Sequence, residues 1–545
     1  MTHSAHLDTF AHDHLPPRDQ WPELIFELPE LQYPERLNCV VELLDRNVAN
    51  GNGGRIAIIG ADCATWTYAQ LQQKVNRIVH VLREDMALVP GNRVLLRGPN
   101  SPMFAACWLA VVKAGMIAVG TMPLLRAKEL TEIVNKAEIG AALCDARLID
   151  ELRATQSACP VLTQIVMYRD DTPDGLEARM GGKPTECDAA DTAAQDTCLI
   201  AFTSGTTGKP KGTMHFHRDI LAACDCFPRS ILKATAEDRF IGSPPLAFTF
   251  GLGGLLLFPM RIGASAVLLE KATPDRLLGA IGAHRASVVV TAPTTYRVIG
   301  SHLQSGGARA DLSNLRKCVA AGEALPAATR ALWKNATGIE IIDGIGSTEL
   351  LHIFISHTED DARPGATGKP IPGYRACMME EDDRPLPPGK IGRLAVKGPT
   401  GCRYLADDRQ RNYVINGWNY TGDAYMIDDD GYFVYQARTD DMIVSAGYNI
   451  AGPEVESALL MHPSVAECGV VGLPDAERGN VVAAFVVLRQ GVVGDAATAK
   501  ELQEFVKQTI APYKYPRAVR FVTALPRTET GKVQRFKLRE MGTGA

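Results

Sequence analysis

The segment 202–212 constrains this chain more than any other stretch of its sequence. It holds four hydroxyl side chains, three glycines and two lysines, namely Thr203, Ser204, Thr206, Thr207, Gly205, Gly208, Gly212, Lys209 and Lys211. Hydroxyls, unobstructed backbone amides and ammonium groups at this density are typical of a polyphosphate site. The apolar run 197–202 directly before it is typical of a buried strand. The sequence therefore predicts a strand that ends at a phosphate-binding loop.

This loop is not a Walker A loop. That motif has the form G-x-x-x-x-G-K-[ST] and opens a helix, whereas here the spacing is G-x-x-G-K and Pro210 follows the lysine. Proline removes an amide donor and disfavours a helical conformation at Lys209. We therefore expect a flap between two strands, and the spacing argues against a P-loop kinase. The alternative is an ordinary polar hairpin, since Gly, Ser and Thr are common in turns.

Five further motifs follow the loop in a fixed order. They are DGIGSTE at 343–349, GKPIPG at 368–373, YTGD at 420–423, RTDDMI at 438–443 and PRTETGK at 526–532. With the loop, this series resembles the motifs of the adenylate-forming enzymes, which include acyl- and aryl-CoA ligases, adenylation domains and luciferases. Any one motif alone is weak, but the ordered set extends from residue 203 to residue 532 and is highly specific.

The length and the residue pattern predict an α/β protein of more than one domain. A chain of 545 residues is too long for one compact core. Strand-like runs alternate with helical patterns, which favours layered, mostly parallel sheets; the strand-like runs are 55–60, 93–97, 141–144, 288–292, 317–321 and 339–342, and the helical patterns are 104–111 and 128–137. Gly322, Glu323, Ala324, Asp343 and Gly344 are expected just past strand ends, where open α/β sheets bind ligands.

The domain boundary is expected near Asp440. We predict an N-terminal domain at 1–439, with a β-barrel-like subdomain implied by the resemblance, and a small mobile α/β domain at 440–545. Residues 160–196 are polar and rich in Pro, Gly and Asp, and we expect a surface connection there.

Charge and composition indicate which partners and which cellular compartment to expect. A net charge of -5 argues against a general nucleic-acid or membrane binder. The N-terminus has no basic start and no apolar core, so it does not resemble a signal peptide, and its histidines are expected in a solvated leader. Thirteen cysteines without paired zinc-type spacing are typical of reduced thiols. We expect a cytoplasmic monomer or homodimer whose partners are small molecules.

The resemblance implies a two-step reaction that uses ATP, Mg²⁺ and CoA. The carboxylate of an acid attacks the α-phosphate of ATP and releases pyrophosphate, and a thiol then displaces AMP. The loop residues Thr203, Ser204, Thr206, Thr207, Lys209 and Lys211 are expected to hold the β- and γ-phosphates. Glu349 is expected to bind Mg²⁺, and Thr348 to contact the α-phosphate. The alternative for Glu349 is a solvated acid at a helix N-terminus.

The remaining nucleotide contacts follow from the other motifs. Asp343 and Gly344 are expected to flank adenine, and Gly322, Glu323 and Ala324 to belong to the same nucleotide site. Asp423 is expected at the ribose, and Arg438 at the ribose or the phosphate. For the last two, the alternative is a surface salt bridge. Ile345 stands where many members of the family carry a stacking tyrosine, so the contact with the base is expected to differ.

The C-terminal motif implies the catalytic lysine. By resemblance, Lys532 bridges the carboxylate and the α-phosphate during adenylation; the alternative is one more exposed lysine. The small domain is then expected to rotate about a hinge at Asp440, which brings Gly447 to a pantetheine channel. Lys514 and Arg478 are candidates for the phosphates of CoA.

The acid is expected to be aromatic. The segments 247–253 and 347–354 resemble the benzoate-CoA-ligase branch, which places Thr249, Phe250, Ala321, His352 and Ile353 around the ring. For Phe250 the alternative is core packing. Benzoate-type members tend to carry a lysine where Val444 and Ser445 stand here. We therefore favour a substituted benzoate, with 2-aminobenzoate first; benzoate and hydroxybenzoates stay open.

Three other activities share much of this pattern. An enzyme that loads a carrier-protein thiol has every nucleotide motif, and a medium-chain fatty acyl-CoA ligase differs in its acid pocket. A non-catalytic binder of acyl-adenylates would be expected to lack Lys532 or Glu349, and both are present.

Overall fold

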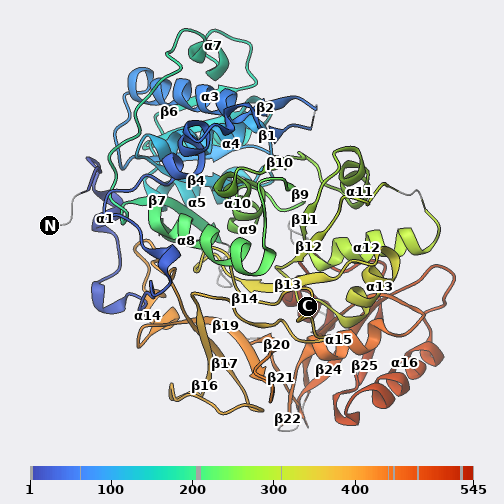
Figure 1. The fold of residues 1–545 in the computed structure, drawn as a ribbon. Coiled ribbons are helices and arrows are strands. Elements are labelled where there is room, and N and C mark those ends of the chain that lie inside the picture. The colour runs from blue at the N-terminus through green and yellow to red at the C-terminus, as the bar shows by residue number, and fades with distance from the viewer. Residues whose placement is uncertain are drawn as a thin grey trace.

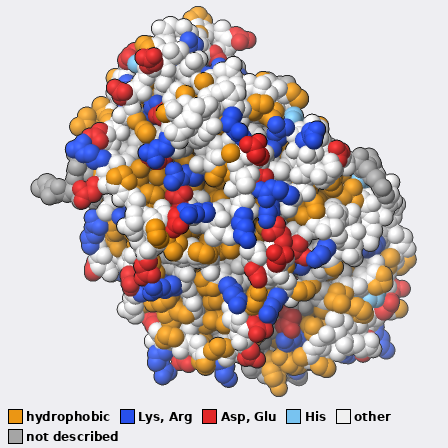
Figure 2. All heavy atoms as spheres, in the orientation of Figure 1, with side chains coloured by type: hydrophobic (Ala, Val, Ile, Leu, Met, Phe, Trp, Pro, Cys, Tyr) orange, Lys and Arg blue, Asp and Glu red, His pale blue; other side chains and the backbone are white. Residues whose placement is uncertain are grey.

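The chain folds into a large N-terminal domain and a small C-terminal domain (Figure 1). This computed structural model describes residues 4–61, 63–203, 210–307, 310–439, 441–445, 448–475, 478–527 and 532–543. Within that part of the chain, no helix is long and apolar enough to cross a membrane. Figure 2 shows acidic and basic side chains interspersed over one face, without a large area of a single sign.

The first sheet of the large domain has six strands in the order β6-β5-β3-β4-β7-β8. They are β3 (Arg93–Arg97), β4 (Ile117–Thr121), β5 (Ala141–Asp145), β6 (Gln164–Tyr168), β7 (Thr197–Thr203) and β8 (Lys211–Phe216). Only β8 is antiparallel to its neighbour, because β7 and β8 form the hairpin that flanks the predicted phosphate loop. The two strands predicted on either side of the loop are therefore confirmed, whereas residues 204–209 of the loop lie outside the described part of the chain.

Helices cover this sheet. They are α3 (Tyr68–His80), α4 (Pro102–Lys113), α5 (Ala127–Ala137), α6 (Ile149–Ala158), α7 (Leu176–Gly181) and α8 (His217–Phe227). The apolar period at 104–111 predicts one buried face for α4, but every residue from Met103 to Lys113 is buried. Lys113 is accommodated because its ammonium group donates to Asp45 at 2.8 Å and to Asn76 at 2.7 Å.

The second sheet has nine strands in the order β15-β14-β13-β12-β11-β9-β10-β1-β2. They are β1 (Ile56–Ile59), β2 (Thr65–Thr67), β9 (Arg239–Gly242), β10 (Ser265–Val267), β11 (Val288–Thr291), β12 (Lys317–Ala320), β13 (Ile341–Gly346), β14 (Ile353–Ser356) and β15 (Lys369–Pro370). Its central strands are parallel, as predicted. Helices α11 (Pro274–Ala283), α12 (Pro293–Gln304) and α13 (Ala327–Thr337) pack against it, and α9 (Thr249–Leu252) and α10 (Phe258–Ile262) belong to the core segment between the sheets.

The third sheet is antiparallel and corresponds to the β-barrel-like subdomain that the resemblance implies. It consists of β16 (Arg375–Met379), β17 (Ile391–Lys397), β18 (Val414–Ile415), β19 (Trp418–Ile427) and β20 (Phe433–Arg438). The short helix α14 (Gln410–Tyr413) precedes β18.

The C-terminal domain is a small α/β unit with its own core. Strands β23 (Val465–Asp475), β24 (Gly479–Leu488) and β25 (Ala518–Phe521) form its sheet, which α15 (Gly452–Leu460), α16 (Ala496–Thr509) and α17 (Arg535–Thr543) accompany. The short hairpin of β21 (Ile443–Ser445) and β22 (Tyr448–Ile450) precedes it. A large N-terminal and a small C-terminal α/β domain are confirmed, whereas the boundary at Asp440 stays a prediction because that residue lies outside the described part.

Three sequence expectations are wrong in detail. The segment 160–196 is not only a connection, since it contributes β6 and the buried Leu176 and Met180 of α7. Asp343 and Gly344 lie within β13 rather than past its end. The leader is not solvated throughout, because Ala11 in α1 (Phe10–Asp13) is buried and the Ser4 hydroxyl donates to Asp196 at 2.6 Å.

Candidate active site

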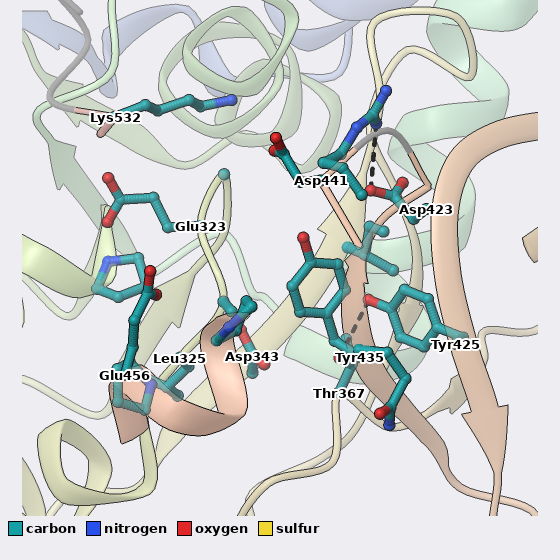
Figure 3. Close-up of a pocket in the computed structure, with 18 of the residues that line it drawn as sticks. Glu323, Leu325, Asp343, Thr367, Asp423, Tyr425, Tyr435, Asp441, Glu456 and Lys532 are labelled. Carbon is teal, nitrogen blue, oxygen red and sulfur yellow. Dashed lines mark hydrogen bonds and ion pairs between the residues drawn. The ribbon is translucent and has the colours of Figure 1, made fainter. Parts of the chain in front are cut away.

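A cavity of about 1240 Å³ opens between the two domains, and most of the predicted nucleotide residues line it. From the large domain they are Lys211, Gly322, Glu323, Ala324, Asp343, Gly344, Glu349, Asp423 and Arg438, and from the small domain Lys532. In Figure 3, Lys532 and Glu323 lie at one side of this cavity and Asp423, Tyr425 and Tyr435 at the other. Residues from motifs far apart in the sequence thus meet at one site.

Lys532 enters the cavity from the small domain. Its Cε would lie 3.7 Å from a Cβ built on Gly322, a residue with φ of +90°, so the lysine packs against the turn after β12. Lys532 is exposed to the open cavity, but the protein atoms around it partly desolvate its ammonium group and lower its pKa, while the nearby carboxylate of Glu323 works in the opposite direction. Glu323 is itself held by the Thr294 hydroxyl of α12, which donates to its Oε2 at 2.7 Å.

Asp423 and Arg438 face each other across two paired strands. They are register partners in β19 and β20, and Arg438 Nη1 lies 3.1 Å from Asp423 Oδ1. The same nitrogen donates to the Thr421 carbonyl at 3.0 Å. Burial raises the pKa of the Asp423 carboxyl, against the positive charge of Arg438. The Asp423 side chain is 11% exposed and the Arg438 side chain 43%, so the pair joins a buried carboxylate to a partly exposed guanidinium.

The strand β13 lines part of the cavity with residues 343–346. Burial raises the pKa of the Asp343 carboxyl to about 7, although the charge of Arg330 opposes this shift. The Ser356 hydroxyl of β14 donates to the Asp343 carbonyl at 2.6 Å, which fixes the strand locally. Ile345, two residues along, is half-buried and also lines the cavity.

Glu349 lines the part of the cavity that Lys211 and Tyr413 also line. Its side chain is buried, and its Oε1 accepts a 2.5 Å hydrogen bond from the Tyr404 hydroxyl. Lys211 Nζ in turn lies 3.4 Å from that hydroxyl. The Oε2 atom of Glu349 has no hydrogen bond to any residue that the structure describes.

The residues that support the site around Glu349 belong to none of the predicted motifs. The neutral ring of His215, whose pKa burial lowers to about 4, donates from Nε2 to the Thr348 carbonyl at 2.8 Å. Tyr413 lies 3.3 Å from the Ser347 hydroxyl. Tyr404 and Tyr413 reach Glu349 and Ser347 from outside any motif, so no local sequence signal identifies them.

The residues predicted around the acid lie beside the cavity but do not line it. Thr249, Ala321, His352 and Ile353 are buried and Phe250 is half-buried. The His352 ring packs among Phe258, Phe250 and Phe227, at centroid distances of 4.4, 5.6 and 5.9 Å. Burial lowers the pKa of His352 to about 3, so the ring is neutral.

His352 carries one unsatisfied polar atom. Its Nε2 lies 3.4 Å from the Phe250 carbonyl oxygen, an acceptor, so this nitrogen carries the proton. The other ring nitrogen, Nδ1, is then an acceptor, and within the described part of the chain this buried atom has no hydrogen-bond partner.

The other predicted residues are placed only in part. Thr203 ends β7 opposite Lys211, and Thr348 follows β13, but neither lines the cavity. Ser204, Thr206, Thr207, Lys209, Asp440 and Gly447 lie outside the described residues. Of the two candidates for CoA phosphates, Lys514 lines the cavity and donates to both oxygens of Glu454 at 2.6 Å, whereas Arg478 does not line it.

Comparison with known proteins gives consistent matches. The AMP-binding enzyme family matches residues 44–404, and the AMP-binding enzyme C-terminal domain matches 454–532. The benzoate-CoA ligase of Thauera aromatica is 35% identical, over 94% of this chain and 97% of its own length.

Two solved structures share the fold over nearly the whole chain. The anthranilate CoA ligase AuaEII in complex with anthranoyl-AMP superimposes with a TM-score of 0.88 at 32% identity, covering 95% of this chain and all of that one. A benzoate CoA ligase from Burkholderia xenovorans LB400 has a TM-score of 0.84 at 30% identity, with coverages of 92% and 100%.

Proposed function

Because the chain belongs to the family of AMP-binding enzymes, we propose that it joins an aromatic carboxylic acid to CoA at the expense of ATP. The acid first forms an aryl-adenylate with release of pyrophosphate, and the CoA thiol then displaces AMP to give the aryl-CoA thioester. Hydroxide is a poor leaving group, so the adenylate is what makes the acyl carbon reactive. The observation that carries the proposal is the meeting of Lys532, Glu323, Asp423, Arg438 and Glu349 around one cavity.

The cavity fits the sugar and base of ATP. Asp423 offers a carboxylate that accepts from two ribose hydroxyls, and Arg438 holds it in place from the paired strand. The β13 backbone at Asp343 and Gly344 and the side chain of Ile345 border the space assigned to adenine. A branched aliphatic side chain covers the base by apolar contact in place of the tyrosine stack.

The corner at Glu349 fits a divalent cation. Glu349 is a buried carboxylate with one oxygen oriented by Tyr404 and the other without a hydrogen bond among the residues that the structure describes. Such a carboxylate suits Mg²⁺, which prefers few carboxylates and several phosphate oxygens. When bound, Mg²⁺ neutralises charge on the triphosphate. Lys211 adds a second positive charge on the same side.

Lys532 acts in the first half-reaction. Its side chain lies in the cavity, where its ammonium group neutralises charge shared between the acid carboxylate and the α-phosphate. Thr348 is proposed to contact the same phosphate in the loaded enzyme, although it does not line the cavity in this structure. For the second half-reaction, we infer that the small domain turns about Asp440 and brings Gly447 to the pantetheine arm.

His352 favours 2-aminobenzoate among the aromatic acids. Among the residues that the structure describes, its Nδ1 is a buried acceptor without a hydrogen-bond partner, and such a group costs about 1–3 kcal/mol when it stays unsatisfied. An ortho amine supplies the missing donor, whereas unsubstituted benzoate does not. Thr249, which is also buried, is a second candidate partner for the amine. The solved relative AuaEII is itself named an anthranilate, that is 2-aminobenzoate, ligase.

A carrier-protein thiol and a medium-chain fatty acid remain alternatives that the comparisons do not favour. The discriminating experiment is kcat/KM for 2-aminobenzoate, benzoate, 4-hydroxybenzoate and octanoate with CoA, in the wild type and in Thr249→Ala and His352→Leu. We expect 2-aminobenzoate to lead benzoate, because benzoate leaves the amine's polar partner unpaired. The variant that removes this partner is expected to shrink the lead, and loss of one contact between the ring and the pocket wall is expected to cost roughly 10–200-fold in kcat/KM. Octanoate as the best substrate would contradict the aromatic assignment, and benzoate ahead of 2-aminobenzoate would remove only the choice of acid.

A further inference from the structure

An ion-pair chain joins the two domains beside the cavity. Glu467 of β23, in the small domain, accepts at Oε1 from Arg297 Nη2 of α12, in the large domain, at 2.7 Å. Arg297 Nη1 also donates to the neighbouring Ala466 carbonyl. The other Glu467 oxygen, Oε2, accepts from Arg527 Nη2 at 2.9 Å. One carboxylate therefore holds a guanidinium from each domain.

Arg527 stands at the base of the segment that carries Lys532. It pairs with Val533, the residue directly after the lysine, through an isolated antiparallel bridge. The Gln534 amide donates to the Pro526 carbonyl at 2.8 Å and closes the same base. The position of Lys532 is therefore tied to that of Arg527, and through Glu467 to Arg297.

In the large domain, the helix α12 carries Arg297 and also contacts Glu323, the carboxylate near Lys532. Thr294, at the start of α12, donates to Glu323, and Arg297 lies one turn later on the same helix. In Figure 1, α12 and α13 lie on the side of the large domain next to the small domain. The same helix thus orients Glu323 through Thr294 and binds the small domain through Arg297.

The three ion-paired side chains are less exposed than those of an ordinary surface salt bridge. The side chains of Arg297, Glu467 and Arg527 are 19%, 28% and 25% exposed, and all three line the cavity. Burial works to raise the pKa of the Glu467 carboxyl, but Arg527 and Arg297 outweigh it and hold the pKa below its ordinary value. The carboxylate is therefore charged in this arrangement.

We propose that Arg297 and Glu467 are positioning residues for adenylation, which fasten the Lys532 segment to α12 and release it before the thioester step. This proposal rests on the proposed function, because it assigns Lys532 to the first half-reaction. Neither residue touches the reacting atoms. Their contribution is the geometry of Lys532, and a displacement of about 1 Å at a reacting centre is enough to lower a rate by roughly 100-fold.

The test uses the full-length enzyme with Arg297→Gln, Glu467→Gln and the double variant. Adenylation is followed by ATP–pyrophosphate exchange, and thioester formation by the reaction of supplied aryl-AMP with CoA. We expect kcat for adenylation to fall roughly 10–100-fold with KM for ATP unchanged, since the nucleotide contacts stay in place. Thioester formation is expected to be unchanged or faster, and the double variant to be no worse than the more impaired single one.

Two controls separate positioning from a general structural effect. Arg297→Lys keeps the charge and is expected to recover part of the adenylation rate. Glu504→Gln removes a carboxylate that pairs with Lys507 at 2.7 Å on α16 of the same small domain, and is expected to leave both half-reactions unchanged. Equal loss of both half-reactions, or full adenylation in both single variants, would overturn the proposal. A wild-type enzyme that adenylates no aromatic acid contradicts the proposed function instead, and this result is visible before any variant is made.

Discussion

The Tyr404 hydroxyl donates a 2.5 Å hydrogen bond to Glu349 Oε1, although 54 residues of sequence lie between them. Burial and the charge of Glu349 raise the pKa of Tyr404, so the phenol stays protonated and acts only as a donor on this bond. The carboxylate proposed to bind Mg²⁺ is therefore oriented by a residue outside every motif.

Tyr404→Phe is expected to weaken the use of Mg²⁺ without abolishing it. Partners that orient a ligand contribute roughly 10–100-fold to metal affinity, so the Mg²⁺ concentration for half-maximal adenylation should rise by about that factor. The control is Tyr374→Phe. It removes a hydroxyl that lies 2.7 Å from the Thr400 hydroxyl, and neither residue lines the cavity. An unchanged Mg²⁺ dependence in Tyr404→Phe would argue against Glu349 as the ligand.

Buried histidines predict that stability falls as the pH drops below 6.5. Burial lowers the pKa of His352 to about 3 and that of His215 to about 4, from an ordinary value of 6.5. Between these values the unfolded chain binds protons that the folded chain does not, so stability rises with pH. The raised pKa of Asp343, about 7, opposes this over part of the range, since there the folded state binds the extra proton.

The contribution of His352 alone is measured by difference. Each such histidine adds up to about 1.4 kcal/mol per pH unit within its window, and His352→Phe removes one of them. The pH dependence of the free energy of unfolding, from denaturant titrations between about pH 4.5 and pH 7, should therefore be shallower in His352→Phe. A matched change at exposed His12, His12→Gln, should leave it as in the wild type. Identical slopes in all three proteins would contradict the buried, neutral state of His352.

Trp333 is expected to be a major contributor to the large domain's stability. It is fully buried and meets Tyr296 edge-on at 4.8 Å, between α13 and α12. Trp333→Ala should cost about 3–5 kcal/mol of unfolding free energy, measured by urea unfolding followed by circular dichroism. Lys334→Ala, which removes a 2.8 Å pair to Glu340 from a 56% exposed side chain, should cost less than about 1 kcal/mol. Similar losses in the two variants would contradict this packing.

The hinge remains a prediction from the sequence, because Asp440 lies outside the described residues. Asp440→Pro restricts the backbone where rotation requires a change in dihedral angles. If the fixed state is the one with Lys532 in the cavity, adenylation should survive better than thioester formation. Comparison of the two half-reactions in this variant tests the position, and equal losses would argue for a hinge elsewhere.

Local pattern predicted most of the fold. The buried runs 93–97 and 141–144 became β3 and β5, and the run before the loop became β7, because strand signals are carried by adjacent residues. The segment 160–196 was misjudged, since the five residues of β6 are too few to stand out from their polar surroundings. The apolar run 339–342 predicts a strand that ends before Asp343, whereas pairing with β14 extends β13 to Gly346.

The motifs predicted the nucleotide side of the site, and the structure brings those described residues together. What the sequence does not contain is the set of supporting contacts, such as Tyr404 with Glu349, His215 with Thr348 and Arg297 with Glu467. Each joins residues more than fifty positions apart, so only the packing of whole elements determines it. The acid pocket depends on the same packing, and its choice of substrate therefore stays a proposal.

The central claim is that Lys532, from the small domain, acts in adenylation within this cavity. The direct measurement is ATP–pyrophosphate exchange by Lys532→Ala with 2-aminobenzoate, beside thioester formation from supplied aryl-AMP and CoA, with Lys537→Ala on the exposed face of α17 as the control. The account predicts that Lys532→Ala loses the exchange and retains thioester formation, while Lys537→Ala retains both. Normal exchange in Lys532→Ala would contradict it.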